Sequence, residues 1–287
     1  MGNSGAVTGL AVCLAAGFLL SAGCTAPAVE KPGPAQVRPM AERGAYSADY
    51  VTTTRREGVT QPFLLLRPEH PVASVILFSG GQGDVRISPA GIRRGGNFLV
   101  RSRERFAEQA LLTAVVDVPS DRSDLSGFRT RRAHALDIKG VIAYLREQAP
   151  LPVWLVGTSR GTISAAKIAD WLADEGGPDG IVLTSSLFVP GPLGESVDAA
   201  DPERIRIPLL LVHHKSDRCW ATPFSRAAGY VQRMTRAQPR ELLPFAGGGP
   251  VRGGVCEPFD YHGFPGLEAQ VVETIASWIK AHPPRTP

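Results

Sequence analysis

The chain alternates short apolar runs with longer segments in which apolar residues recur every three or four positions. The runs predict buried strands, and the longer spacing predicts amphipathic helices. Strands are expected at residues 72–79, 113–118, 152–156, 180–183, 208–212 and 241–243. Helices are expected at residues 97–112, 130–148, 162–173, 225–234 and 267–282. An early β-hairpin is expected at Ser47–Arg67. The alternation predicts an α/β fold, with a mostly parallel central sheet and helices on both faces.

The first 23 residues contain no Asp, Glu, Lys or Arg. Their apolar core, from about Ala6 to Leu20, is shorter than the ~20 residues that a membrane-spanning helix needs. A core of this length is typical of a secretory signal peptide. We therefore interpret residues 1–23 as a signal peptide.

The stretch Ser21-Ala22-Gly23-Cys24 is similar to a bacterial lipoprotein processing site, in which small residues precede a cysteine. This similarity predicts lipidation at Cys24 and a lipid anchor to the membrane of an exported cell-envelope protein. Ser21 stands where such sites usually have Leu, and the segment Met1–Ser4 lacks the usual basic residues. An ordinary signal peptide cut near Ala26 and an uncleaved anchor are the alternatives.

Residues 24–45 are rich in Pro, Ala and Gly, which predicts a flexible tether. Residues 46–287 have the length of one large α/β domain. The net charge of +4 is mild, and no basic face with interleaved aromatic residues is evident, so a nucleic-acid-binding protein is not expected. The densest basic stretch runs from Arg86 to Arg105. It is expected to be a solvated surface, with contact to an anionic substrate group as the alternative.

The sequence Gly157-Thr158-Ser159-Arg160-Gly161 lies between a predicted strand and a predicted helix. In this context G-x-S-x-G forms a sharp turn that exposes the serine oxygen above the sheet, and its glycines avoid clashes with the neighbouring elements. From Val72 to His282 the chain resembles the α/β-hydrolase family in this motif and in the order of its elements. The resemblance implies that fold, with Ser159 as a nucleophile.

The same resemblance implies a catalytic acid after a later strand and a histidine before the last helix. Asp217 follows the strand expected at Pro208–Val212, and His262 precedes the final helix. The implied roles are His262 as general base and then acid, and Asp217 as the group that fixes its tautomer. Asp198 and Asp201 are the alternatives for the acid.

Acyl transfer also needs donors for the developing oxyanion. The resemblance implies the backbone N–H of Arg160 as one donor and that of Gly81 or Gln82 as the other, from the sequence Ser79–Gly83. These glycines do not complete a dinucleotide-binding pattern, and no phosphate-binding lysine is present, so no cofactor is expected. No metal site is expected either.

The remaining histidines are predicted to have structural or surface roles rather than catalytic ones. His213 and His214 are expected to pack or to fix a loop, because no further metal ligands accompany them. His70, His134 and His282 are expected on the surface.

Two of the four cysteines, Cys13 and Cys24, belong to the N-terminal segment. Cys219 and Cys256 remain, and we expect them to form a disulfide in an oxidising compartment. This disulfide would tie the loop of Asp217 to the loop of His262 and hold the two residues in register. Two buried free thiols are the alternative.

The segment between the strands at residues 180–183 and 208–212 is too short for a large helical lid, so an open site is expected, with residues 84–96 as another wall. The sequence predicts an envelope-anchored serine hydrolase that acts on small-molecule or polymeric carboxylic esters. A serine peptidase on the same fold and a non-catalytic binding lipoprotein are the alternatives.

Overall fold

A computed structural model describes residues 33–43 and 46–283 of the 287-residue chain. The expected signal peptide at 1–23 and the expected lipidation site at Cys24 lie outside the described residues. Among the described helices, none is both long and apolar enough to cross a membrane.

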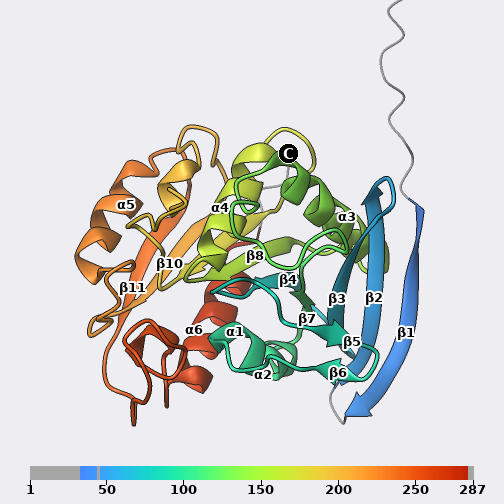
Figure 1. Ribbon diagram of the computed structural model, residues 1–287, viewed down its shortest axis with the longest axis horizontal. Coiled ribbons are helices and arrows are strands. Elements are labelled where there is room, and N and C mark those ends of the chain that lie inside the picture. Colours follow the sequence, from blue (N-terminus) through green and yellow to red (C-terminus); the bar gives the residue numbers. More distant parts are fainter. Residues whose placement is uncertain (1–32, 44–45, 284–287) are drawn as a thin grey trace, which may run out of the picture. The chain divides into compact units, whose positions relative to one another are not determined.

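The described residues form a nine-stranded sheet in the order β1-β2-β3-β7-β4-β8-β9-β10-β11 (Figure 1). Neighbouring strands from β7 to β11 run parallel, whereas β1, β2 and β3 form an antiparallel edge. The strand bounds are β1 Gly33–Arg43, β2 Tyr46–Arg56, β3 Val59–Pro68, β4 Ala73–Phe78, β7 Leu111–Val116, β8 Val153–Thr158, β9 Gly180–Thr184, β10 Leu209–His214 and β11 Arg240–Phe245. The mostly parallel sheet expected from the sequence is therefore present.

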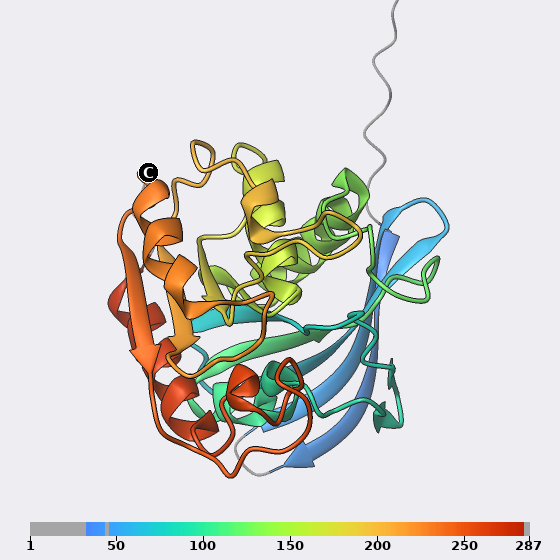
Figure 2. The ribbon, with the colours of Figure 1, turned by 60° about the vertical axis from the view of Figure 1, so that its left-hand side comes forward.

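Helices cover both faces of this sheet, as Figures 1 and 2 show. One apolar cluster joins the sheet to α3 Arg132–Gln148, α4 Gly161–Trp171 and α5 Ala227–Arg233. A second cluster joins the other face to α1 Phe98–Arg101, α2 Arg103–Glu108 and α6 Glu268–Ala281. Shorter elements are β5 Ile87–Ser88, β6 Gly91–Ile92, η1 Val197–Ala199, η2 Phe224–Arg226 and η3 Tyr261–Gly263. Because both faces are covered, β4 and β8 are buried at every position, which explains their continuous apolar runs.

The expected tether differs from the structure, because residues 33–43 form β1 and pair with β2 at the edge of the sheet. Pro34 and Pro39 are compatible with an edge strand, since proline removes a hydrogen-bond donor that an edge does not need on its outer side. The register shifts of β1 lie between Gly33 and Gln36 and between Pro39 and Ala41, next to these prolines. The folded domain therefore begins before residue 46.

The single helix expected at residues 97–112 is also different in the structure. It is divided into α1 and α2, with Ser102 between them, and ends at Glu108. Ala110 has a φ of 58°, so the chain leaves the helix there and β7 begins at Leu111. The apolar residues at 111 and 112 thus belong to the next strand.

Candidate active site

Ser159 lies on a tight turn between β8 and α4, with a φ of 53° that is unusual for a residue with a side chain. A Cβ atom on Gly157 would lie 2.4 Å from the carbonyl oxygen of Gly161. A Cβ atom on Gly161 would lie 2.2 Å from the carbonyl oxygen of Phe78. The two glycines therefore allow the turn to sit against its neighbours, and the turn leaves Ser159 half-buried at the end of a strand.

Asp217 and His262 are brought together from different parts of the chain. Asp217 follows β10, and His262 lies in η3. The His262 Nδ1 atom is 3.1 Å from the Asp217 Oδ2 atom, and both side chains are buried. Asp217 Oδ1 also accepts a hydrogen bond of 2.9 Å from the Cys219 N–H. Burial raises the pKa of Asp217, but the hydrogen bonds to its carboxylate and the neighbouring imidazole outweigh this effect, so the pKa lies below its ordinary value.

Thr222 is a third member of this cluster that the sequence did not reveal. Its Oγ1 atom donates a hydrogen bond of 2.8 Å to Asp217 Oδ2 and lies 3.2 Å from His262 Nδ1. The Thr222 carbonyl oxygen lies 2.8 Å from His213 Nε2. Burial lowers the pKa of His213, which favours a neutral ring that donates to this carbonyl. His213 and His214, whose Nε2 lies 3.0 Å from the Gly247 carbonyl oxygen, thus fix loops as expected.

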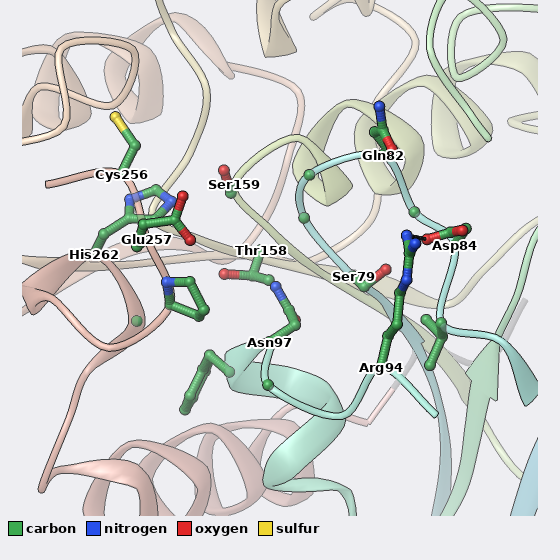
Figure 3. A pocket seen from close by; sticks show the side chains of 18 residues that line it. Ser79, Gln82, Asp84, Arg94, Asn97, Thr158, Ser159, Cys256, Glu257 and His262 are labelled. Carbon is green, nitrogen blue, oxygen red and sulfur yellow. Dashed lines mark hydrogen bonds and ion pairs between the residues drawn. The ribbon is translucent and has the colours of Figure 1, made fainter. Parts of the chain in front are cut away.

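Ser159 and His262 face a common cavity of about 340 Å³ (Figure 3). In the described part of the chain no hydrogen bond joins these two side chains. Such contacts are often long in a ligand-free enzyme and shorten when substrate binds. The arrangement therefore places a hydroxyl and a carboxylate-bound imidazole on the walls of one cavity.

The glycine-rich loop at residues 79–83 forms another wall of the cavity. A Cβ atom on Gly80 would lie 2.9 Å from the Ser159 Cβ atom, so this loop approaches the serine as closely as a backbone can. Gly81 has a φ of 57° and is exposed. Among the described residues, no group accepts a hydrogen bond from the backbone N–H of Gly81, Gln82 or Arg160. These three N–H groups are thus free to bind a ligand oxygen.

Arg129 supports this loop from the protein interior and was not identified from the sequence. Its side chain is fully buried, and its Nη2 atom donates to the carbonyl oxygens of Ser79 at 3.2 Å and Gly81 at 3.3 Å. Its Nη1 atom donates to Ser164 Oγ on α4 at 2.8 Å. Burial lowers the pKa of Arg129 to about 9, so the group is still a cation at neutral pH.

The alternative acids and three of the histidines occupy positions away from this centre. Asp198 pairs with Arg233, and Asp201 accepts the Glu203 N–H, so neither contacts His262. His70 is exposed as expected. The expectation for His134 is wrong, because it is buried with its Nε2 atom 3.0 Å from Ser164 Oγ.

His282 also departs from the expectation of a free surface residue. It is half-buried, its ring contacts Trp278, and its Nδ1 atom lies 2.8 Å from the Trp278 carbonyl oxygen. Within the ranges that the structure describes, no group of His, Cys, Asp and Glu is placed to hold a metal ion.

The structure contains the disulfide expected between Cys219 and Cys256, two residues separated by 37 positions. Cys256 also lines the cavity that holds Ser159 and His262. The bond therefore joins the two loops that carry Asp217 and His262.

The basic stretch 86–105 is more structured than a solvated surface. Arg86 and Arg94 both pair with Asp84. Arg101 is largely buried and donates to Glu268 and to the Gly263 carbonyl oxygen next to His262. Arg101 thus supports the histidine loop.

Comparison with known protein families and with curated protein sequences gave no match. The structure is similar to that of a cold-adapted esterase from an Arctic intertidal metagenomic library, with a TM-score of 0.57 and 14% identity over 83% of this chain and 96% of that one. It is also similar to dienelactone hydrolase from Anabaena variabilis, with a TM-score of 0.58 and 16% identity over 83% and 99% of the two chains.

A third similar structure is an acetyl xylan esterase from Paenibacillus sp. R4, with a TM-score of 0.56 and 12% identity over 86% of this chain and 88% of that one. At such low identity the similarity establishes the fold. This chain has the α/β-hydrolase fold, with helices on both faces of a mostly parallel sheet and, within its described residues, no lid domain.

Proposed function

We propose that this protein is a serine hydrolase that acts on carboxylic esters through Ser159, His262 and Asp217. The observation that supports this proposal best is that Ser159, on its strained turn, faces the same cavity as an imidazole hydrogen-bonded to a buried carboxylate. A nucleophile, a base and a group that orients the base are the parts that acyl transfer requires.

In the proposed reaction the Ser159 Oγ atom attacks the ester carbonyl while His262 Nε2 takes its proton. Asp217 keeps the other imidazole proton on Nδ1 and stabilises the imidazolium as it forms. The N–H of Arg160 and that of Gly81 or Gln82 bind the developing oxyanion. His262 then gives its proton to the departing alcohol, and a water molecule hydrolyses the acyl-enzyme by the same steps.

The test uses the full chain, purified in detergent, and a fluorophosphonate probe that labels activated serines. Labelling and hydrolysis of short-chain p-nitrophenyl esters should both disappear in Ser159→Ala. Ser120→Ala changes an exposed serine outside the cavity and serves as the matched control. No labelling of the folded, oxidised wild type would refute the proposal and favour a non-catalytic binding protein, whereas cleavage of peptides in preference to esters would favour a peptidase.

We also propose that the protein is exported and anchored by a lipid at Cys24. The disulfide between Cys219 and Cys256 supports export, because such bonds persist in oxidising compartments. Cells that express the chain and are fed labelled palmitate should yield a labelled, membrane-bound protein. A Cys24→Ser variant that is still labelled would contradict the anchor.

A further inference from the structure

Two cavities of different chemical character meet at Ser159. The first has a volume of about 340 Å³ and is the one that Figure 3 shows. The second has a volume of about 450 Å³. Ser159, Gly81 and Cys256 line both cavities. Both volumes lie in the range of small-molecule binding sites, so the two parts of one ligand can lie on either side of the serine.

The second cavity is mainly apolar, and we call it the apolar cavity. Its apolar walls are Leu187, Val189, Pro192, Leu193, Trp220 and Ala221. Its charged lining residues, Arg160 and Glu195, form an ion pair of 3.2 Å and so offset each other. An apolar group is therefore the part of a ligand that this cavity suits.

The rim of the apolar cavity carries exposed apolar surface. Trp220 and Leu193 are the most exposed large apolar side chains among the described residues, at 61% and 58%. Isolated exposed apolar residues are common on proteins, but these two both line one apolar cavity. They extend the apolar surface on which an acyl chain can be buried.

Half of the residues that line the first cavity have polar side chains, a larger share than in the apolar cavity, and we call it the polar cavity. Its polar lining residues are Ser79, Gln82, Asp84, Arg94, Asn97, Thr158, Ser159, Glu257 and His262. Asp84 pairs with Arg94 and also with Arg86, which does not line the cavity, so its charge is neutralised. The exposed Glu257 carboxylate has no ion pair or hydrogen bond with another described side chain. The polar cavity therefore offers hydrogen-bonding groups and one carboxylate, that of Glu257, that no described cation pairs with.

The position of His262 orients the ligand between the two cavities. His262 lines the polar cavity and does not line the apolar cavity. The alcohol that leaves the carbonyl carbon of the ester must receive its proton from His262, so the alcohol belongs on the side of the imidazole. The acyl group then extends to the other side, past Arg160.

We infer that the substrate is an ester of an apolar acid with a polar alcohol that carries no negative charge. The acyl chain occupies the apolar cavity and the alcohol occupies the polar cavity. This inference rests on the proposed ester hydrolysis and adds to it the chemical class of the substrate.

The first experiment compares three esters with the full chain in detergent: hexanoyl glycerol, acetyl glycerol and butyl hexanoate. We expect kcat/KM for hexanoyl glycerol to exceed each of the other two by at least tenfold, because only this ester matches both cavities. Equal or higher kcat/KM for acetyl glycerol or for butyl hexanoate would overturn the inference.

The second experiment assigns each cavity to its part of the ester. Trp220→Ala should lower the ratio of kcat/KM for hexanoyl over acetyl glycerol about tenfold, whereas Val72→Ala, at an exposed residue outside both cavities, should leave the ratio unchanged. Glu257→Lys should raise kcat/KM for hexanoyl glycerol 3-phosphate relative to hexanoyl glycerol about tenfold. A Trp220 variant that changes alcohol preference, or a Glu257 variant that changes acyl preference, would reverse the assignment.

Labelling by a fluorophosphonate separates this inference from the proposed function. A wild type that is not labelled shows that the proposed function itself fails. A wild type that is labelled and hydrolyses esters, but without the expected preferences, shows that the inference alone fails.

Discussion

The guanidinium of Arg129 donates a hydrogen bond of 3.3 Å to the carbonyl oxygen of Gly81, from beneath the glycine-rich loop. The carbonyl and the N–H of one trans peptide point in opposite directions. The bond from Arg129 therefore turns the N–H of Gln82 away from the interior. A cation at the carbonyl also polarises the peptide and makes its N–H a stronger donor. The N–H of Gln82 is therefore a better candidate for the second oxyanion donor than the N–H of Gly81.

Arg129→Met should lower kcat about a hundredfold with a smaller change in KM. Without the bond from Arg129 the N–H of Gln82 would be misplaced, and an oxyanion donor stabilises the transition state more than it stabilises the bound substrate. Arg129→Lys retains a cation but not the planar fork that bonds both Ser79 and Gly81, so it should recover only part of kcat. Steady-state kinetics and thermal unfolding would be measured on each variant. A folded Arg129→Met protein with wild-type kcat would contradict this role.

His134 should make stability depend on pH. Burial lowers the pKa of the folded-state imidazole to about 3, from an ordinary value of 6.5. Between these pH values the unfolded chain binds a proton at His134 and the folded chain does not. The contribution of His134 to the free energy of unfolding is therefore fully present above pH 6.5 and is lost as the pH falls toward 3. The free energy of unfolding should fall by up to about 1.4 kcal/mol per pH unit from this group.

Urea unfolding of His134→Gln at pH 7, 6, 5 and 4 would test this dependence. The variant should show a shallower decline than the wild type, because its side chain does not titrate. His70→Gln changes an exposed histidine and should retain the wild-type slope. Identical slopes for all three proteins would mean that His134 is not held neutral.

Local features of the sequence were sufficient to predict the parallel strands of the sheet and the turn at Ser159. The parallel strands are buried on both faces and therefore appear as continuous apolar runs. The turn depends on Gly157 and Gly161, which stand two positions before and after the serine. Asp217 and His262 could be placed because the order of elements resembles that of a known fold, and the structure brings their side chains within hydrogen-bonding distance.

The remaining features depend on contacts between distant parts of the chain. Arg129 lies 50 positions from Ser79, and Thr222 lies 40 positions from His262, with no local pattern to mark either pair. The strand β1 is stabilised by backbone pairing with β2 rather than by an apolar pattern of its own, so its composition suggested a tether. His134 is polar, and its burial follows from its aromatic neighbours Phe78 and Phe128.

Removal of the disulfide by Cys219→Ser with Cys256→Ser should reduce both stability and activity. A link between residues 37 positions apart stabilises the fold by about 4 kcal/mol in the chain-entropy account. It also holds the Asp217 and His262 loops together, so kcat should fall at temperatures where the variant is still folded. Activity and circular dichroism would be followed together during reduction of the wild type. Full activity in the folded double variant would show that the disulfide does not keep these loops in register.

Gly161→Ala should prevent the turn at Ser159 from forming. The added Cβ atom would lie 2.2 Å from the Phe78 carbonyl oxygen and 2.9 Å from that of Ser79, and backbone atoms cannot rotate away as a side chain can. We expect a loss of at least about 3 kcal/mol in the free energy of unfolding, or no soluble protein, from overpacking against the sheet. Soluble yield and thermal unfolding would be measured beside Gly229→Ala.

Gly229 makes a suitable control because it lies in α5, and a Cβ atom there would meet no atom within 4 Å. Alanine in a helix is favoured over glycine, so Gly229→Ala should stabilise the protein by up to about 1 kcal/mol. The same substitution is thus expected to destabilise the protein at Gly161 and to stabilise it at Gly229, because a new methyl group meets backbone atoms only at Gly161. A Gly161→Ala protein as stable as Gly229→Ala would mean that β4 can move away from the turn. The close approach of β4 would then not be the reason that position 161 requires glycine.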